Sequence, residues 1–287
     1  MLFVRSDAIV ISEIDFGRKN MEKEQILYDA EGLRLAYGRF ETPNSSKQNL
    51  HHHPQSCEIL CIHQCKGVFH VEGSAYPVNP GDLILIQPNE AHYMEVNPSA
   101  PYDRTVIRFH ASLFDSMDSQ RTILRPFFER QIGKRNLYRQ SKSSKLEWSQ
   151  IINSMRNNPN RQTILFKLTG LLEQLYEEFS QPYLESEKEP LEYRIMQYIK
   201  ENLHEQISTQ TLCDRFFISR TQLHQRFIKA TGISVGRYIA ARRMMTAQQL
   251  ITQGGKPTDI YTQCGFRDYS TFYRAYIKYH GHSPNKE

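Results

Sequence analysis

The feature that most constrains the fold is a short helix, a tight turn and a longer helix, encoded near the C-terminus in "ISTQTLCDRFFISRTQLHQRFIKATG". Ser208 is placed to cap the short helix and Ser219 to cap the longer one, because serine hydroxyls accept hydrogen bonds from the first free N–H groups of a helix. Phe217 and Ile218 fall in the turn between them, and Gly232 marks the end of the longer helix. This spacing predicts a helix-turn-helix unit.

The same unit occurs a second time in "KPTDIYTQCGFRDYSTFYRAYIKYHGHSP". The pattern predicts a short helix over residues 257–263, a turn over residues 264–266, and a second helix between the cap Asp268 and the stop Gly281. A continuous helix is predicted between the two units, from Ser234 to Ile251. The last third of the chain is therefore expected to be an all-helical domain in which one helix sets the distance between two similar units.

Charge is distributed unevenly along the chain. Residues 190–287 contain 14 Lys and Arg against 7 Asp and Glu, whereas residues 1–189 contain 22 against 24. A basic surplus confined to one domain favours a polyanionic partner for that domain, with an ordinary solvated surface as the alternative.

The doubled unit resembles the DNA-binding domain of the AraC family of bacterial transcription regulators. The resemblance spans residues 192–284 and rests on residues found in the family's order, namely Gly232, Arg242, Ile260, Gly265, Phe266, Phe272, Arg274, Gly281 and Pro284. It implies double-stranded DNA as a partner, and RNA polymerase is a further candidate partner.

A DNA-reading helix must bury one face in its own domain and present another to the major groove. In the first unit Leu223 and Phe227 are the predicted core, and in the second unit Phe272, Tyr276 and Tyr279. The positions off these stripes are the predicted DNA contacts: Arg220, Thr221, His224 and Gln225 in the first unit, and Tyr269, Ser270, Tyr273 and Arg274 in the second. Arg242 and Arg243 lie between the units, where one is expected to bind phosphate or form an ion pair at the edge of the core.

Residues 25–110 have a different pattern, in which short apolar runs alternate with Gly, Pro, Asn and Ser. Examples are "LRLAYGRF", "SCEILCIH", "SAYPV" and "RTVIRFH", each four to eight residues long. Many short strands at this spacing predict a small barrel or sandwich.

The segments "HHHPQSCEILCIH" and "GDLILIQPNEAHY" resemble the cupin barrel. In its metal-binding members the equivalents of His51, His53, Glu58 and His92 hold Mn, Fe, Zn or Ni. The resemblance to AraC regulators implies another role, because their cupin-like sensor domains use such residues to line a metal-free effector pocket. We favour that second role, with no metal and no cofactor, while a metal-binding sensor and structural histidines stay open. His52 is expected to be exposed.

Cys57, Cys61 and Cys65 recur every fourth residue, so a strand would place them on one face with Ile59 and His63. Core filling is the favoured interpretation, and a soft-metal or oxidant-sensing site is the alternative. Five cysteines without a paired pattern favour reduced thiols.

A further helix is predicted over residues 163–179, with an apolar stripe and an acidic last turn. The stripe could cover the barrel, but helices at this place in similar regulators pair across a two-fold axis. The resemblance thus implies a homodimer. Its expected contacts are Leu165, Leu168, Leu172 and Leu175.

These patterns predict an α+β chain of two domains: a cupin-like sensing and dimerisation domain at 1–180, a linker at 181–190, and a DNA-binding domain at 191–287. The expected function is effector-responsive, sequence-specific control of transcription, with a small-molecule effector such as a sugar and target genes of carbohydrate or other small-metabolite use.

The alternative is a cupin-type metal-dependent enzyme with a helical appendage. Such an enzyme would not need the duplicated basic unit, and the chain shows no nucleophile-base set and no phosphate loop. No apolar run is long enough to span a membrane, and the opening has acidic residues where a signal peptide would need its apolar run, so a cytoplasmic protein without a membrane partner is expected.

Overall fold

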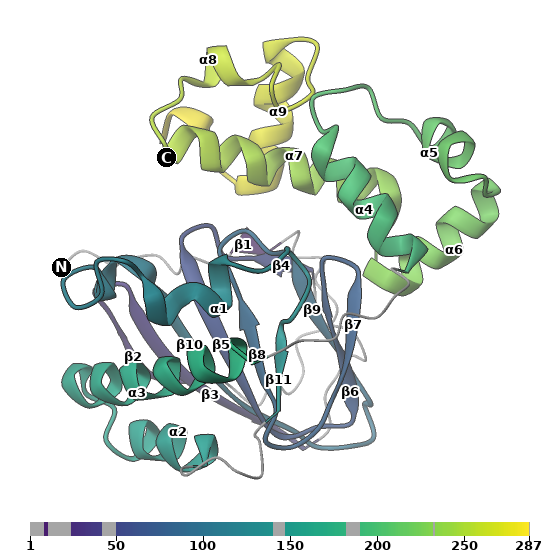
Figure 1. Cartoon of the computed structure of the whole chain (residues 1–287). Helices are drawn as coiled ribbons and strands as arrows, with labels where there is room; N and C mark the ends of the chain where they lie inside the picture. The colour runs from purple at the N-terminus through teal and green to yellow at the C-terminus, as the bar shows by residue number, and fades with distance from the viewer. Residues whose placement is uncertain are drawn as a thin grey trace.

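The computed structural model describes residues 9–10, 24–41, 50–139, 147–181, 190–231 and 233–286. Gly232 and residues 182–189 of the expected linker lie outside these ranges. The described chain forms a β-rich domain followed by a helical domain that lies over one end of its sheets (Figure 1).

The β-rich domain consists of two antiparallel sheets. The first has the order β1 (Ile9–Val10), β4 (His51–His52), β9 (His92–Val96), β6 (Gly67–Val71) and β7 (Ser74–Val78). The second has the order β11 (Leu137–Tyr138), β8 (Leu83–Ile86), β5 (Ser56–Gln64), β10 (Tyr102–His110), β3 (Leu33–Phe40) and β2 (Gln25–Ala30). The strands predicted from the alternating pattern are confirmed.

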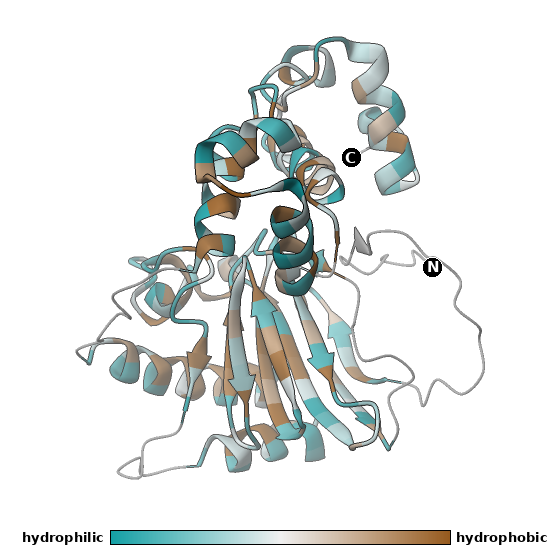
Figure 2. Cartoon of the chain, turned by 90° about the vertical axis from the view of Figure 1, so that its right-hand side faces the viewer, coloured by the Kyte–Doolittle hydropathy of each residue, from teal (hydrophilic) through white to brown (hydrophobic). Residues whose placement is uncertain are grey.

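Residues two apart on a strand point to the same face, so a central strand of the second sheet such as β5 contributes to two cores. Hydropathy accordingly changes along the strands in Figure 2. Leu60 and Ile62 of β5 pack toward the first sheet, against residues such as Phe69 and Met94. Their neighbour Ile59 faces the opposite side, where helices cover the sheet.

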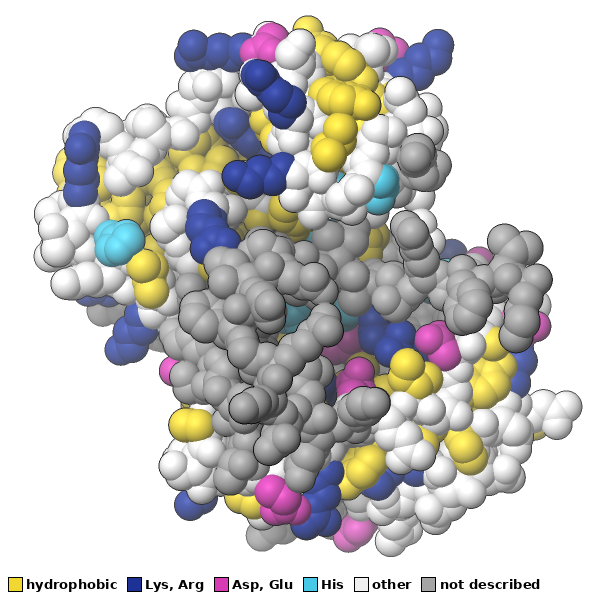
Figure 3. All heavy atoms as spheres, turned by 180° about the vertical axis from the view of Figure 1, so that it is seen from behind, with side chains coloured by type: hydrophobic (Ala, Val, Ile, Leu, Met, Phe, Trp, Pro, Cys, Tyr) yellow, Lys and Arg dark blue, Asp and Glu magenta, His cyan; other side chains and the backbone are white. Residues whose placement is uncertain are grey.

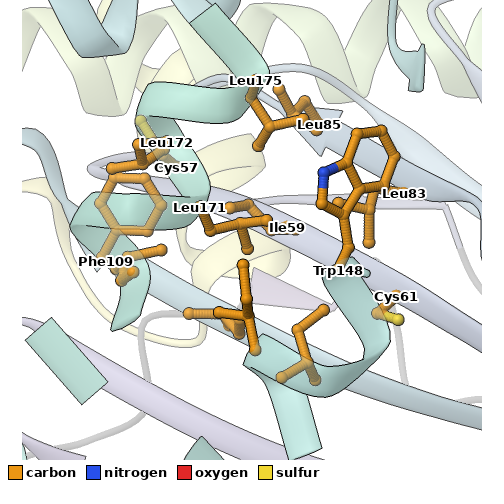
Figure 4. Close-up of a cluster of buried hydrophobic side chains, with 14 of the residues drawn as sticks. Cys57, Ile59, Cys61, Leu83, Leu85, Phe109, Trp148, Leu171, Leu172 and Leu175 are labelled. Carbon is orange, nitrogen blue, oxygen red and sulfur yellow. The ribbon is translucent and has the colours of Figure 1, made fainter. Parts of the chain in front are cut away.

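That covering layer includes η1 (Ala111–Phe114), η2 (Thr122–Leu124), α1 (Arg125–Phe128), α2 (Trp148–Asn157) and α3 (Arg161–Phe179). Figure 4 shows Leu171, Leu172 and Leu175 of α3 beside Ile59 and Leu85 of the sheet. The helix predicted over residues 163–179 is thus confirmed.

The expected dimer contacts need correction. Leu168, Leu172 and Leu175 are fully buried in the core between α3 and the sheet, and Leu165 packs partly against it. The apolar stripe of α3 stabilises the fold of its own chain, because the sheet offers it a large apolar face. It is not available to a second chain.

The cysteines of β5 fill the core, but not all on one face. Cys57 and Cys61 are buried in the core between the sheet and the helices that cover it, whereas Cys65 follows the end of β5 and belongs to the core between the sheets. The expectation of a common face is therefore correct for Cys57 and Cys61, which lie within β5, but not for Cys65. Burial raises the pKa of Cys61 to about 12 and that of Cys65 to about 11, so both remain thiols near neutral pH.

The helical domain contains α4 (Leu191–Glu201), α5 (Thr209–Phe216), α6 (Arg220–Thr231), α7 (Val235–Thr252), α8 (Pro257–Ile260), α9 (Tyr269–His280) and η3 (Pro284–Lys286). Both helix-turn-helix units are present, although the short helix expected over residues 257–263 ends at Ile260 and is followed by turns over residues 261–265. The predicted caps form as well: Ser208 accepts from the N–H of Thr211 at 3.0 Å, and Asp268 accepts from that of Thr271 at 2.8 Å. Gly281 ends α9 with a φ of 76°.

Helix α7 joins the two units because it contributes to both of their cores. Tyr238 and Met245 pack with α4, α5 and α6, whereas Met244 and Ala247 pack with α8 and α9. Two packed faces on one helix hold the units in a fixed relation. Among the described residues, no helix is both long and apolar enough to cross a membrane.

Candidate functional site

The first candidate site is the exposed face of α6. Leu223 and Phe227 are buried as predicted. All four expected contact positions, Arg220, Thr221, His224 and Gln225, are exposed. Helix α6 therefore has the two faces that a groove-reading helix needs.

One of these side chains is already held in place. The Arg220 guanidinium donates to the side-chain oxygen of Gln210 from Nε at 3.2 Å and from Nη2 at 2.8 Å. Gln210 in turn donates to Asp214 at 2.6 Å. This network joins α5 to the start of α6 and orients the Arg220 side chain, while the Nη1 hydrogens of its guanidinium are not used in these bonds.

The second unit presents a similar but more aromatic face on α9. Phe272 and Tyr276 are fully buried, and Ser270 and Arg274 are exposed. Tyr269 and Tyr273 are half-buried, with ring centroids 5.9 Å apart. Tyr279, expected in the core, is partly buried and packs against the cluster that contains Phe272 and Tyr276.

Basic side chains lie around these helices. Figure 3 shows Lys and Arg spread over the helical domain with few acidic side chains on the same face. The cationic surplus is thus on the domain that presents the reading helices. This arrangement suits the phosphate backbone, which supplies most of the sequence-independent affinity for DNA.

The second candidate site is a polar cluster in the β-rich domain. His51 and His92 are paired across β4 and β9, with ring centroids 4.3 Å apart. His53 Nε2 lies 2.9 Å from Glu58 Oε2, and His92 Nε2 lies 3.8 Å from Glu58 Oε1. His51 is half-buried and the other three are buried. The four residues expected to form one pocket do come together.

The hydrogen bonds fix how His92 is protonated. Its Nδ1 lies 2.8 Å from the carbonyl oxygen of Glu90, which can only accept, so Nδ1 carries the hydrogen and Nε2 is an acceptor. Burial lowers the pKa of His92, so the ring is neutral at pH 7. Burial alone would raise the pKa of Glu58, but the N–H of His53 and the Arg108 guanidinium hold it well below its usual range.

Sequence reasoning missed Arg108. In the β10–β5 pairing Arg108 is opposite Glu58, and its Nε lies 3.7 Å from Glu58 Oε2. Its Nη1 lies 3.5 Å from His53 Nδ1. Strand alternation could have identified Arg108 as an inward-facing residue. It lies two residues from Val106, on the same face of β10, and Val106 packs in the core between the sheets.

The residues that could hold a metal are His51, His53 and His92, whose ligand nitrogens lie within 4.8 Å of one another. Arg108 disfavours that use. Its guanidinium already balances the Glu58 carboxylate, so a divalent cation would sit beside a fixed positive charge. Three imidazole nitrogens are suitable metal ligands, but the positive charge of Arg108 beside them favours a neutral polar ligand over a cation.

His52 corrects another expectation, because it is fully buried rather than exposed. Burial, followed by the nearby charge of Arg242 in α7, lowers its pKa well below the usual value. Alternation along β4 turns His52 away from the side-chain cluster that contains His51 and His53. It faces the helical domain.

Together these features define a class of protein. A β-rich domain with a buried cluster of polar side chains is joined to a helical domain with two groove-reading helices, which is the organisation of a ligand-responsive DNA-binding protein.

The family comparisons make the class specific. An AraC-like ligand binding domain matches residues 34–187, and a helix-turn-helix domain matches residues 212–286. The chain belongs to the AraC family of transcription regulators. It therefore binds DNA through its helical domain and a small molecule through its β-rich domain, and it is a regulator rather than an enzyme.

Similar proteins span most of the chain. An uncharacterised HTH-type transcriptional regulator, YbfI of Bacillus subtilis, is 27% identical over 200 residues, which cover 68% of this chain and 70% of that protein. The Msm operon regulatory protein of Streptococcus mutans is 24% identical, over 79% and 82%. Among solved structures, ToxT of Vibrio cholerae covers 89% of this chain and 97% of its own, at 14% identity and a TM-score of 0.38.

Proposed function

We propose that the protein senses a hydroxylated small molecule, such as a sugar, in the pocket of His51, His53, Glu58 and His92, and controls transcription of carbohydrate or other small-metabolite genes in response. We propose the domain boundaries expected from the sequence: sensing at 1–180, a linker at 181–190 and DNA binding at 191–287. The protein would act in the cytoplasm, with RNA polymerase as a further partner.

One observation carries the choice of effector. Among the described residues, His92 Nε2 and Arg108 Nε are buried without a hydrogen-bond partner. The first is an acceptor and the second a donor. Buried polar groups without partners are costly, and a hydroxyl group can both donate to the imidazole and accept from the guanidinium. A polyol would complete the pocket without adding charge.

DNA recognition is proposed for the eight exposed or half-exposed positions on α6 and α9. Gln225 suits adenine and Arg274 suits guanine, because their side chains can bond those bases bidentately. Ser270, Thr221 and the two tyrosines suit phosphate. His224 lies one residue before Gln225 on the same exposed face.

A homodimer is proposed through the outward face of α3 instead of its buried stripe. Phe166 is 77% exposed there, and Gly170, one turn later, has open space over its Cα. An exposed aromatic beside a glycine allows two helices to approach closely, and the contact is self-complementary about a two-fold axis. This placement is supported by the burial of the leucines on the other face.

A thermal-shift screen of sugars, sugar acids and divalent metal salts tests the proposed effector. A polyol that fills the pocket should raise the melting temperature of the wild type, since a ligand at 100 times its Kd stabilises the native state by about 2.7 kcal/mol. The shift should be lost in His92→Phe. It should persist in His63→Gln, which changes a histidine of β5 that hydrogen-bonds Thr105 outside the pocket.

A shift produced by a metal salt and by no hydroxylated compound would replace this proposal with a metal sensor. A polyol shift that survives His92→Phe would place the effector elsewhere in the protein.

A further inference from the structure

The turn between β6 and β7 reaches into the helical domain. Glu72, at the start of this turn, is buried, and its carboxylate accepts from Arg242 Nη1 at 2.6 Å and from the Tyr238 hydroxyl at 3.1 Å. Both donors are on α7. Gly73 is packed so closely that a side chain there would meet the Met196 sulfur at 2.6 Å. The Glu72 carboxylate of the β-rich domain is thus held by two side chains of α7, the helix that joins the two helix-turn-helix units.

The same contact continues back to the pocket by two short routes. Glu72 accepts from the N–H of Ala91 at 2.7 Å and donates its own N–H to the Ala91 carbonyl at 3.0 Å. Ala91 immediately precedes His92. On the second route, the N–H of Asn89 donates to the carbonyl of His53 at 2.9 Å, and the Asn89 carbonyl accepts from Arg242 at 3.2 Å.

The apolar surroundings make this contact tight. Leu50, Ala91 and Tyr93 of the sensor belong to the same buried cluster as Leu223 and Phe227 of α6. The Tyr93 hydroxyl also donates to the carbonyl of Ala230, near the end of α6, at 3.1 Å. On β9, therefore, His92 faces the pocket and its neighbour Tyr93 contacts the first reading helix.

We infer that Arg242 is the residue through which the pocket acts on the two reading helices. A ligand that displaces His53 or His92 moves Asn89 and Glu72, and these hold Arg242 on α7. Because the pair is buried, its attraction depends steeply on geometry, and a small displacement favours a second arrangement of α7. The inference rests on the proposed effector role of the pocket.

The alternative roles of Arg242 and Arg243 can now be separated. Arg242 forms a buried ion pair with the sensor, whereas Arg243 donates to the carbonyl of Glu205 within the helical domain. The two arginines are adjacent on one helix. Arg243 therefore provides a matched control.

A double-mutant cycle on the full chain tests the inference without the effector. The probe is a DNA duplex selected by the wild-type protein from a random library, with Kd measured by fluorescence anisotropy. His92→Phe should change Kd about fivefold or more, in the range typical of coupling between sites. In Arg242→Gln the same pocket substitution should change Kd less than twofold, and in Arg243→Gln its full effect should remain.

An equal effect of His92→Phe in the Arg242→Gln and wild-type backgrounds would overturn the inference, and so would no effect in either. If circular dichroism shows that Arg242→Gln is not folded, Glu72→Gln and then Tyr238→Phe take its place, with the same expected loss of coupling. Failure of the wild type to select any DNA sequence, or of any small molecule to bind the pocket, would instead count against the proposed function.

Discussion

Arg130 and Glu90 form an ion pair whose side chains are both fully buried, with Nη2 and Oε2 2.7 Å apart. Arg130 also donates to the carbonyls of Leu85, Pro126 and Lys134. Replacing Arg130 by Met leaves Glu90 charged and without its cation in the core. We expect a loss of about 3–5 kcal/mol in the free energy of unfolding, measured by urea denaturation.

The matched control is Arg125→Met. Arg125 pairs with Glu129 at 2.8 Å, but both side chains are about half exposed, so water screens the pair. Its loss should cost less than about 0.5 kcal/mol. Similar losses for the two variants would mean that the Arg130 pair is not buried in solution.

At the reading positions, replacing His224 and Gln225 by Ala should reduce discrimination among operator sequences by about 1–3 kcal/mol for each base that these side chains read. The fold should be unaffected, because both side chains are exposed. Competition binding against single-base variants of a selected duplex measures the effect, with His204→Ala, an exposed histidine outside both reading helices, as the control. Unchanged preferences would remove α6 from the base-reading surface.

At this scale the sequence predicted what depends on local pattern. Leu223 and Phe272 are core by helical spacing, and His53, Glu58 and His92 meet because motif spacing encodes strand positions. Arg108 and Glu72 were missed because their roles depend on which strand or domain is opposite, and that partner is distant in sequence.

At the scale of the element, the two faces of α3 have different roles: one packs in the core, and the other is the proposed dimer contact. Leu172→Ala should destabilise the chain by about 2–5 kcal/mol, since it removes a fully buried side chain from a packed core. Phe166→Glu should leave that free energy almost unchanged, because Phe166 is exposed, but should convert a dimer to a monomer in sedimentation velocity. A Phe166→Glu variant that remains dimeric would move the interface away from α3.

The elements themselves were largely predictable because each carries its own start and stop signals. Ser208 and Asp268 cap helices where expected, and β3 and β7 have the predicted limits. The use of α3 was not predictable, since an apolar stripe indicates that a face is covered without indicating by what. Here the sheet that contains Ile59 and Leu85 supplies the cover.

At the scale of the whole molecule, two domains that look independent in sequence share a buried interface. The linker pattern and the change in charge marked a boundary near residue 190, yet Leu50 and Tyr93 pack in the core of the first reading unit. Tyr93 and its partner Ala230 are 137 residues apart, so no local pattern reports such a contact. These contacts fix the position of α6 relative to the strands that carry the proposed effector pocket.

We propose that one chain inserts α6 and α9 into consecutive major grooves of the DNA, with α7 setting the distance between them. Base-methylation interference on a selected duplex measures this directly. We predict two patches of interference per bound chain, about 10 base pairs apart, with one lost in the His224 and Gln225 double variant and the other in Arg274→Ala. A single patch, or one patch erased by both variants, would contradict it.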